Sequence, residues 1–276
     1  MPNIRINGAD FFAVETGEGD PIVLVHGSLS DYRTWVMHAR EISRRHRVIA
    51  YSRRYHFPNA TAENDPQYSV ALHADDLAGV IRTRAGGAAH VVTSSFGGCV
   101  ALRLATESPE LFKSLVLCEP PLMPWLTRSA EGMKSFLEVK AAQEASDRAF
   151  KAGNQRDGVK LFSDMAVGPG FFDATPPRSQ ARIMDNAYEL SLEMAAAAEV
   201  YFPRFNCQEL AALTVPMLFL CADQSPAHYR IIADELVKCL PRAEKETIPD
   251  SAHMIHSTNP LAFSKSVARF LEQGDP

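Results

Sequence analysis

The stretch HVVTSSFGGCVALRLATE, residues 90–107, decides how this chain folds. Its first residues, HVVT, predict a β-strand. From Phe96 onward the apolar residues recur at helical spacing, and only Ser94 and Ser95 separate the two patterns. A buried strand that turns at once into a helix is the repeating unit of a parallel sheet covered by helices.

The same alternation extends in both directions from this stretch. Further strands are predicted in the apolar runs at 21–27, 46–52, 113–121 and 215–223, with a shorter one in KETIPD, 245–250. Helical patterns follow Tyr32, Ser69 and Pro226, and another closes the chain at 260–273. A strand pair is expected near the N-terminus. The sequence therefore predicts an α/β fold with a mostly parallel central sheet and helices on both of its faces.

One long segment breaks this alternation. The strand pattern stops at Pro120 and Pro121 and resumes at Val215. Residues 122–207 carry two helical patterns and no run typical of a buried strand. We therefore predict a core formed by residues 1–121 and 208–276, with residues 122–207 inserted into it as a helical cap.

Composition limits the kinds of partner. The net charge of −5 gives no reason to expect nucleic acid or an anionic membrane, and no apolar run approaches the about 18 residues of a membrane-spanning helix. The N-terminus lacks the features of a signal peptide. None of the five cysteines lies in a C-x-x-C pair, which argues against a zinc or redox motif. We expect a cytoplasmic protein in which Cys99, Cys118 and Cys221 serve as small core residues.

The turn TSSFGG, residues 93–98, points to a nucleophile. A serine in a tight strand-to-helix turn projects its hydroxyl above the carboxyl edge of the sheet, and the helix N-terminus beneath it favours developing negative charge. Ser95 is the candidate, since it is Ser95 and not Ser94 that has glycine two residues later. The usual pattern is G-x-S-x-G, and here Thr93 replaces the first glycine. Without further context, a serine-glycine turn that only packs explains the motif equally well.

The chain resembles the α/β-hydrolase family from about residue 10 to residue 272. The matching pieces are VLVHGS at 23–28, SRRYH at 52–56, the S-x-G-G turn at 95–98 and SAH at 251–253. Together they are specific for the fold and for a nucleophilic serine, and they do not identify a substrate.

This resemblance implies roles for further residues. His253, which precedes the terminal helix, stands where the family delivers its general base. The loop after VLVH implies an oxyanion hole made by the backbone N–H groups of Phe96 and of Ser28, or alternatively Leu29. His26 is expected to support this loop. The other histidines are expected at the surface, at edges or in structural roles: His38, His46, His56, His73, His90, His228 and His256.

The acid of the catalytic triad has two candidates. The family often carries an aspartate after the strand at 215–223, but alignment by Pro226 places Ser225 at that position and Asp223 two residues early. A second family location follows the preceding strand, where this chain has Glu119. A carboxylate that ends a buried strand needs a partner, which favours Glu119. Asp223 remains the alternative acid, and either choice keeps the order serine, acid, histidine.

The predicted function is hydrolysis of a small, fairly hydrophobic ester, lactone or thioester through a serine acyl-enzyme, with no metal or organic cofactor and a small molecule as partner. The predicted cap offers Met123, Trp125, Phe171 and Phe172 as substrate-binding residues, although each could instead pack the cap onto the core. One alternative is a C–C bond hydrolase or cofactor-free enzyme that uses the same triad. The other is a non-catalytic ligand-binding protein of this fold.

Overall fold

A computed structural model describes residues 3–61, 67–196 and 204–273. Its centre is a sheet of eight strands in the order β1-β2-β4-β3-β5-β6-β7-β8. The first three strands in the chain are β1 (Asn3–Ile6), β2 (Ala9–Thr16) and β3 (Pro21–Val25), and the others are β4 (Arg47–Tyr51), β5 (Ala89–Thr93), β6 (Phe112–Cys118), β7 (Met217–Ala222) and β8 (Glu244–Ile248). β1 pairs with β2, and β2 with β4, in antiparallel fashion, whereas every pair from β4 to β8 is parallel. The predicted mostly parallel sheet is therefore confirmed.

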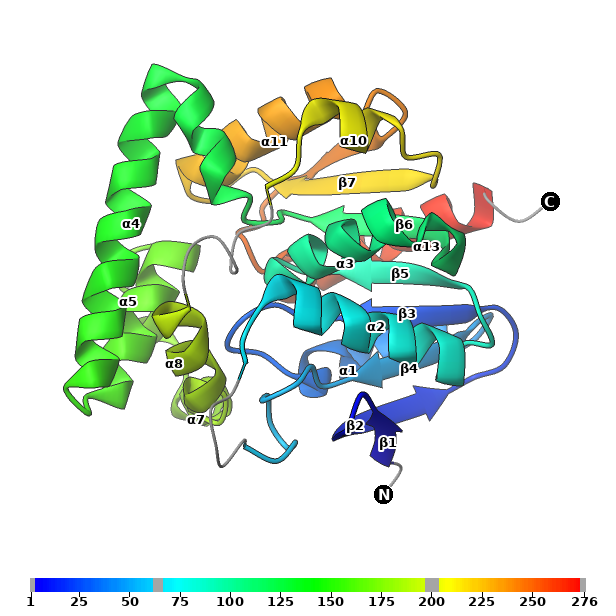
Figure 1. The fold of residues 1–276 in the computed structure, drawn as a ribbon, viewed down its shortest axis with the longest axis horizontal. Coiled ribbons are helices and arrows are strands. Elements are labelled where there is room, and N and C mark those ends of the chain that lie inside the picture. Colours follow the sequence, from blue (N-terminus) through cyan, green and yellow to red (C-terminus); the bar gives the residue numbers. More distant parts are fainter. Residues whose placement is uncertain (1–2, 62–66, 197–203, 274–276) are drawn as a thin grey trace.

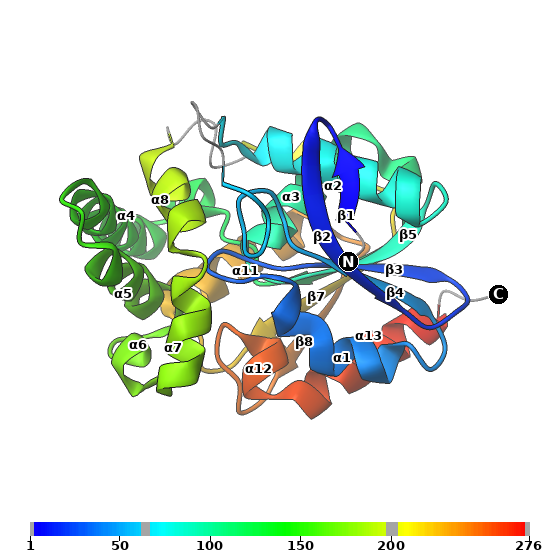
Figure 2. The ribbon, with the colours of Figure 1, turned by 90° about the horizontal axis from the view of Figure 1, so that it is seen from below.

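Helices cover both faces of the sheet (Figures 1 and 2). One face carries α2 (Val70–Arg84), α3 (Phe96–Glu107), α10 (Cys207–Ala211) and α11 (Ala227–Cys239), and the other carries α1 (Val36–Ile42), α12 (Ile255–Thr258) and α13 (Pro260–Gln273). Short 3-10 helices precede α1 and β6, namely η1 (Tyr32–Trp35) and η2 (Pro109–Leu111). Successive strand residues such as Leu24 and Val25 belong to opposite clusters. This is why the central strands are apolar throughout.

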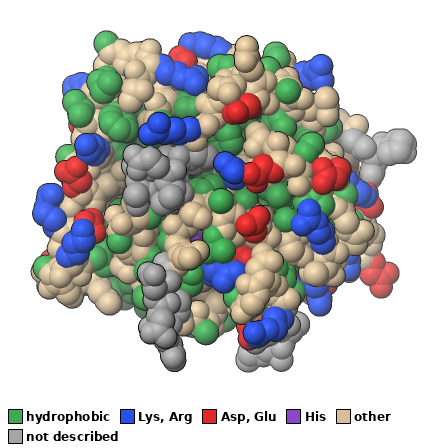
Figure 3. All heavy atoms as spheres, in the orientation of Figure 1, with side chains coloured by type: hydrophobic (Ala, Val, Ile, Leu, Met, Phe, Trp, Pro, Cys, Tyr) green, Lys and Arg blue, Asp and Glu red, His purple; other side chains and the backbone are tan. Residues whose placement is uncertain are grey.

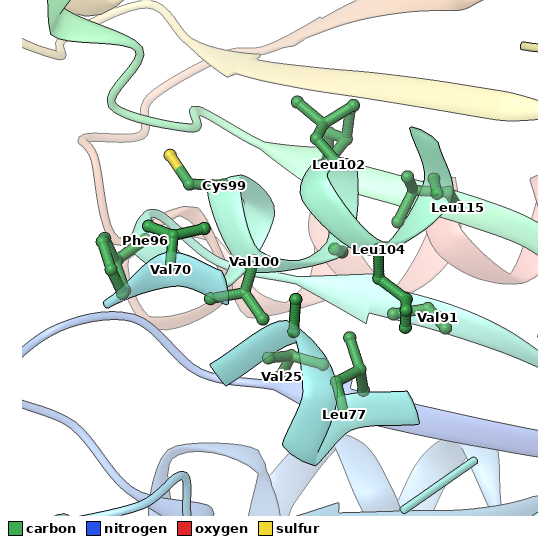
Figure 4. Close-up of a cluster of buried hydrophobic side chains, with 14 of the residues drawn as sticks. Val25, Val70, Leu77, Val91, Phe96, Cys99, Val100, Leu102, Leu104 and Leu115 are labelled. Carbon is green, nitrogen blue, oxygen red and sulfur yellow. The ribbon is translucent and has the colours of Figure 1, made fainter. Parts of the chain in front are cut away.

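Helix α2 begins where the sequence predicts, after Ser69. Ser69 caps α2, since its side chain accepts a hydrogen bond from the backbone N–H of Leu72. Figure 4 shows α3 packed against α2 and the sheet through Val25, Val70, Leu77, Val91, Phe96, Cys99, Val100, Leu102, Leu104 and Leu115. The position of α3, and so of the serine that precedes it, is thus fixed by a largely apolar interface.

The described part of the segment predicted as an insertion contains helices joined by turns and no strand. It contains η3 (Met123–Arg128), α4 (Ala130–Lys151), α5 (Gln155–Val167), α6 (Phe171–Ala174), α7 (Pro177–Met184) and α8 (Ala187–Ala195). Residues 197–203 of the predicted cap lie outside the described residues. Helices α4, α5, α7 and α8 stand together beside one end of the sheet (Figure 1). Among the described helices, none has the length and apolar character that crossing a bilayer requires.

The cysteines divide into two groups. Cys99, Cys118 and Cys221 are free and buried, as expected for small core residues, and burial raises the pKa of Cys221 to about 12. Cys207 and Cys239 form a disulfide that joins α10 to α11.

The face shown in Figure 3 carries acidic and basic side chains interspersed with apolar ones. Charges of opposite sign also pair on the surface, for example Arg103 with Glu107 and Lys151 with Asp147. This face therefore offers no broad field of one sign to attract a highly charged polymer.

Candidate active site

Ser95 occupies a strained turn between β5 and α3. Its backbone has a φ of 50° and a ψ of −125°, a conformation that residues with a Cβ rarely adopt. The backbone N–H of Ser95 donates to the Cys118 carbonyl at 2.8 Å, which ties the turn to the end of β6. Strain that the surrounding structure holds in place is typical of functional sites.

The residues around Ser95 explain both the match and the departure in the turn motif. A Cβ on Gly97 would lie 2.5 Å from the Val25 carbonyl oxygen, so only glycine fits there. Thr93 is accommodated because its hydroxyl donates to the Val116 carbonyl at 2.9 Å, and because the neighbouring helix residue is Gly98. Thr93 in place of glycine therefore does not disrupt the turn.

His253 lies against Ser95, as the sequence predicts. Its Nε2 atom is 2.9 Å from Ser95 Oγ, and its Nδ1 atom is 2.9 Å from Glu119 Oε2. A carboxylate oxygen only accepts, so Nδ1–H donates to Glu119 and Nε2 of the neutral ring accepts from the serine hydroxyl. The imidazole is also stacked on the ring of Tyr229, with 3.8 Å between the ring centroids. Nothing in the sequence pointed to Tyr229.

The structure places Glu119, and not Asp223, beside the histidine. Glu119 is 2 % exposed, and its φ of 44° is again unusual for a residue with a side chain. Its Oε1 accepts from the Ala222 backbone N–H at 2.8 Å, and its Oε2 accepts from Ser225 Oγ at 2.7 Å. Ser225 is the residue that aligns with the family's more frequent acid position. In this chain the Ser225 hydroxyl at that position donates to the Glu119 carboxylate.

Asp223 binds the backbone of the loop before His253 and does not take part in the hydrogen bonds around the imidazole. Its carboxylate accepts the backbone N–H groups of Asp250 and Ser251, each at 3.0 Å. These two hydrogen bonds lower the pKa of Asp223. Asp223 therefore fixes the loop that leads to His253, and in this structure it does not contact the imidazole ring.

A cavity of about 70 Å³ opens at Ser95 and His253, and Ser28 lines it too. Its remaining wall is largely apolar and includes Leu29, Phe162, Ala166, Val167, Phe171, Ile183 and Met254. A second, outer groove of about 440 Å³ shares Leu29, Ser30, Phe171, Ile183 and Met254 with it. Helices α5, α6 and α7 thus provide one wall of the space in front of the serine.

Of the four residues expected to bind substrate, Phe171 lines this cavity. Phe172 is fully buried in a cluster with Val159 and Leu190 of neighbouring helices. Met123 and Trp125 are 3 % and 2 % exposed and pack into the main core. The expectation is corrected for these three, because η3 turns its apolar side chains onto the core and α6 points successive residues in different directions.

This difference between neighbours leads to a prediction. We expect Phe171→Ala to raise KM for a hydrophobic ester severalfold with little change in Tm, because a lining ring is lost. Phe172→Ala should instead lower the free energy of unfolding by about 3–5 kcal/mol, as for other fully buried phenylalanines, with KM unchanged. Steady-state kinetics and urea unfolding of both variants measure this. A raised KM for Phe172→Ala at unchanged stability would contradict it.

The histidines are more deeply buried than expected. His38, His46, His73, His90 and His228 are all at most 9 % exposed, so the expected solvent-facing location is wrong for these five. His256 is 4 % exposed, which agrees with the structural role given as one of its two alternatives. Burial lowers the pKa of His256 to about 3, with smaller contributions from His38 and His253. The Nε2 atom of His256 lies 2.8 Å from the Thr34 hydroxyl oxygen, within hydrogen-bond distance. His256 also lines the cavity. The apolar runs around these residues were too short to show their burial.

Comparisons with known proteins agree with this architecture. Residues 22–265 match the family described as "Alpha/beta hydrolase family". The chain is 22% identical to 2-(acetamidomethylene)succinate hydrolase of Mesorhizobium japonicum, over 94% of this chain and 90% of that protein. It is 27% identical to polyketide synthase ThaQ of Burkholderia thailandensis over 96% of this chain, which spans only 12% of that synthase.

Solved structures share the fold at low identity. The carboxylesterase CesB (YbfK) of Bacillus subtilis superposes with a TM-score of 0.79 and 17% identity, covering 99% of this chain and 91% of that one. Such similarity supports the arrangement of strands and helices, and the chemistry must be argued from the side chains themselves.

Proposed function

Because this chain belongs to the alpha/beta hydrolase family, we propose that it is a serine hydrolase for small, fairly hydrophobic esters, lactones or thioesters. One observation carries the proposal. An unbroken hydrogen-bonded series runs from Ser95 through His253 to the buried Glu119, and it begins at a cavity wall. This is the arrangement that activates a serine hydroxyl for attack on a carbonyl.

In the proposed mechanism, Ser95 Oγ attacks the substrate carbonyl while His253 Nε2 takes its proton. Glu119 holds the ring in the required tautomer and stabilises the imidazolium that forms. His253 then returns the proton to the leaving alcohol or thiol, which leaves an acyl group on Ser95. A water molecule activated by the same imidazole hydrolyses this acyl-enzyme and restores the serine.

The oxyanion formed in each step is proposed to bind the backbone N–H groups of Ser28 and Phe96. Ser28 lines the cavity and Phe96 is the first residue of α3. Leu29, which follows Ser28 and also lines the cavity, is the alternative donor. Two donors aimed at one oxygen provide much of the rate enhancement in such enzymes.

The two connected spaces suggest how a substrate is divided. We assign the acyl part to the inner cavity of about 70 Å³ and the leaving group to the outer groove of about 440 Å³. The helices η3 to α8 act in this proposal as a cap, since Phe162 and Phe171 from this segment close one side of the cavity. The apolar wall favours hydrophobic acyl groups.

A preference for short acyl chains is expected. Among p-nitrophenyl esters, kcat/KM should be highest for acetate or butyrate. It should fall by at least about tenfold for the octanoate, since each methylene that does not fit forfeits on the order of 1 kcal/mol. An initial-rate series over these esters at fixed pH measures the preference. A rate that rises steadily to the octanoate would contradict the assignment of the acyl group to the inner cavity.

A fluorophosphonate probe tests the proposal as a whole. Peptide mass mapping should locate the label on Ser95, and pre-labelled protein should no longer hydrolyse p-nitrophenyl acetate. Labelling without turnover of any ester, lactone or thioester would favour the C–C hydrolase or cofactor-free alternative. Failure to label Ser95 would reject the serine mechanism and favour a ligand-binding protein.

A further inference from the structure

A buried group of charged side chains lies behind the oxyanion loop and has no part in the mechanism above. Its centre is Arg53, which follows β4 and is 1 % exposed. Glu189 of α8 is fully buried beside it, with 3.7 Å between Arg53 Nη2 and Glu189 Oε1. Buried charges are costly unless they are paired, and their retention calls for a reason.

The Arg53 side chain donates hydrogen bonds to the loop that leads to Ser28. Its Nε donates to the His26 carbonyl at 3.0 Å and its Nη2 donates to the Gly27 carbonyl at 3.2 Å. The Arg53 backbone N–H also donates to His26 Nε2 at 2.9 Å. The positions of both carbonyls before Ser28 are therefore set by one guanidinium group.

The His26 ring makes two hydrogen bonds, one to the same loop and one to Arg53. Its Nδ1 lies 2.8 Å from the Gly27 carbonyl oxygen, which can only accept, so Nδ1 carries the proton and Nε2 is left to accept from Arg53. Burial, with smaller effects of His56 and Arg53, holds the pKa of His26 well below its ordinary value, so the ring stays neutral. The Gly27 carbonyl thus accepts two hydrogen bonds. In a trans peptide the N–H points opposite to the carbonyl, so the same peptide unit turns the Ser28 N–H away from Arg53.

Arg53 also contacts the other half of the oxyanion hole. The carbon at the centre of its guanidinium lies 4.9 Å from the centroid of the Phe96 ring, a cation–π distance. Phe96 provides the second proposed donor. A single cation therefore contacts the carbonyl of the peptide unit that contains the Ser28 N–H and the side chain of the residue that carries the second donor.

The countercharge comes from the cap segment. Glu189 Oε1 accepts from the Tyr68 hydroxyl at 2.7 Å and lies 3.0 Å from His56 Nε2. Burial raises the pKa of Glu189, and the neighbouring Arg53 cation and the Tyr68 hydroxyl oppose that effect. Glu189 therefore holds Arg53 from the cap segment, while Arg53 donates to the carbonyls of the residues directly before Ser28.

We propose that Arg53 is a positioning residue that aligns both oxyanion donors, and that Glu189 of α8 supplies the countercharge that keeps Arg53 in place. The inference rests on the proposed serine hydrolase function and adds to it a coupling between the cap and the oxyanion hole. Neither side chain touches the substrate in this account. They act through the backbone of residues 26–28 and through Phe96.

The first test is Arg53→Met, with Arg54→Met as its matched control. Arg54 is adjacent in sequence and forms its own ion pair with the buried Asp76 at 2.7 Å, but its hydrogen bonds and ring contact involve Asp76, Asn7 and Phe11 and not the oxyanion loop. We expect Arg53→Met to lower kcat by about 10- to 100-fold with KM within about twofold of wild type, somewhat less than the loss of an oxyanion donor. Arg54→Met should keep the wild-type kcat per folded molecule.

A transition-state analogue separates positioning from a general loss of structure. The affinity for an aryl trifluoromethyl ketone, whose adduct with Ser95 places an oxyanion between the donors, should fall by the same factor as kcat/KM in Arg53→Met. Unchanged affinity for the analogue, or a kcat equal to that of Arg54→Met, would overturn the proposal.

Glu189→Gln tests the countercharge and covers the case in which Arg53→Met does not fold. It preserves shape and can keep the hydrogen bond from Tyr68. It should lower kcat and analogue affinity together by about 3- to 10-fold at near-constant KM, which corresponds to about 1 kcal/mol of lost transition-state binding. Wild-type kcat in a folded Glu189→Gln variant would reject the role of Glu189. If the wild-type protein itself neither hydrolyses esters nor labels at Ser95, the serine hydrolase proposal fails first.

Discussion

Ser95→Ala is expected to lower kcat for ester hydrolysis by about 10⁶-fold, because removal of the nucleophile abolishes the acyl-enzyme route. Only the slower attack of water assisted by the oxyanion donors would remain. The measurement is p-nitrophenyl ester hydrolysis at substrate saturation. Fluorophosphonate labelling should disappear in the same variant.

Ser94→Ala provides the matched comparison for this substitution. Ser94 is the neighbouring serine, is 5 % exposed and anchors the turn through its backbone N–H, which donates to Val25. Loss of its hydroxyl should cost no more than about tenfold in kcat. Equal losses in the two variants, or substantial turnover by Ser95→Ala, would show that residue 95 is not the nucleophile.

The second large effect is expected at Glu119. Glu119→Gln should lower kcat by about 10³- to 10⁴-fold with little change in Tm, since an amide in this position favours the wrong tautomer of His253. Asp223→Asn should leave kcat nearly unchanged, because Asp223 binds backbone N–H groups at 250 and 251 and not the ring. Steady-state kinetics and thermal unfolding of the two variants distinguish the acids.

A rescue variant sharpens this comparison. Ser225 Oγ lies 2.7 Å from Glu119 Oε2, so a carboxylate introduced at 225 can reach the same region beside His253. Adding Ser225→Asp to Glu119→Gln should recover part of the lost kcat, whereas Ser225→Asp on the wild-type background places two carboxylates together and should not help. Mild and equal effects of Glu119→Gln and Asp223→Asn would show that neither residue acts as the triad acid.

The proposed coupling of the oxyanion hole to the buried Arg53–Glu189 pair has a mechanistic consequence. Donors made from backbone amides cannot be adjusted by changing their own side chains, so their geometry depends on what holds the loop. In this protein one of the holding charges is anchored by Glu189, far along the chain in α8. Substitutions that move α8 are therefore expected to affect kcat as well as substrate access.

The sequence by itself determined the features that depend on neighbours along the chain. Continuous apolar runs identified the central strands, because a strand buried on both faces must be apolar at every position. The abrupt change from strand to helix pattern at residues 93–98 made Ser95 the candidate nucleophile, and the resemblance of SAH at 251–253 to the family made His253 the candidate base. Each of these signals is local, so one stretch of residues is enough to show it.

Only the tertiary structure decided the features that depend on residues distant in sequence. Glu119 and Asp223 both follow sheet strands, and the sequence favoured Glu119 without excluding Asp223, since what separates them is a side-chain direction set by packing at the ends of β6 and β7. The burial of all nine histidines and the pairing of Arg53 with Glu189 likewise depend on elements far apart in the chain. Such contacts leave no periodic signal in the sequence, because a pairing across 100 or more residues is fixed by how the layers pack and not by local backbone preference.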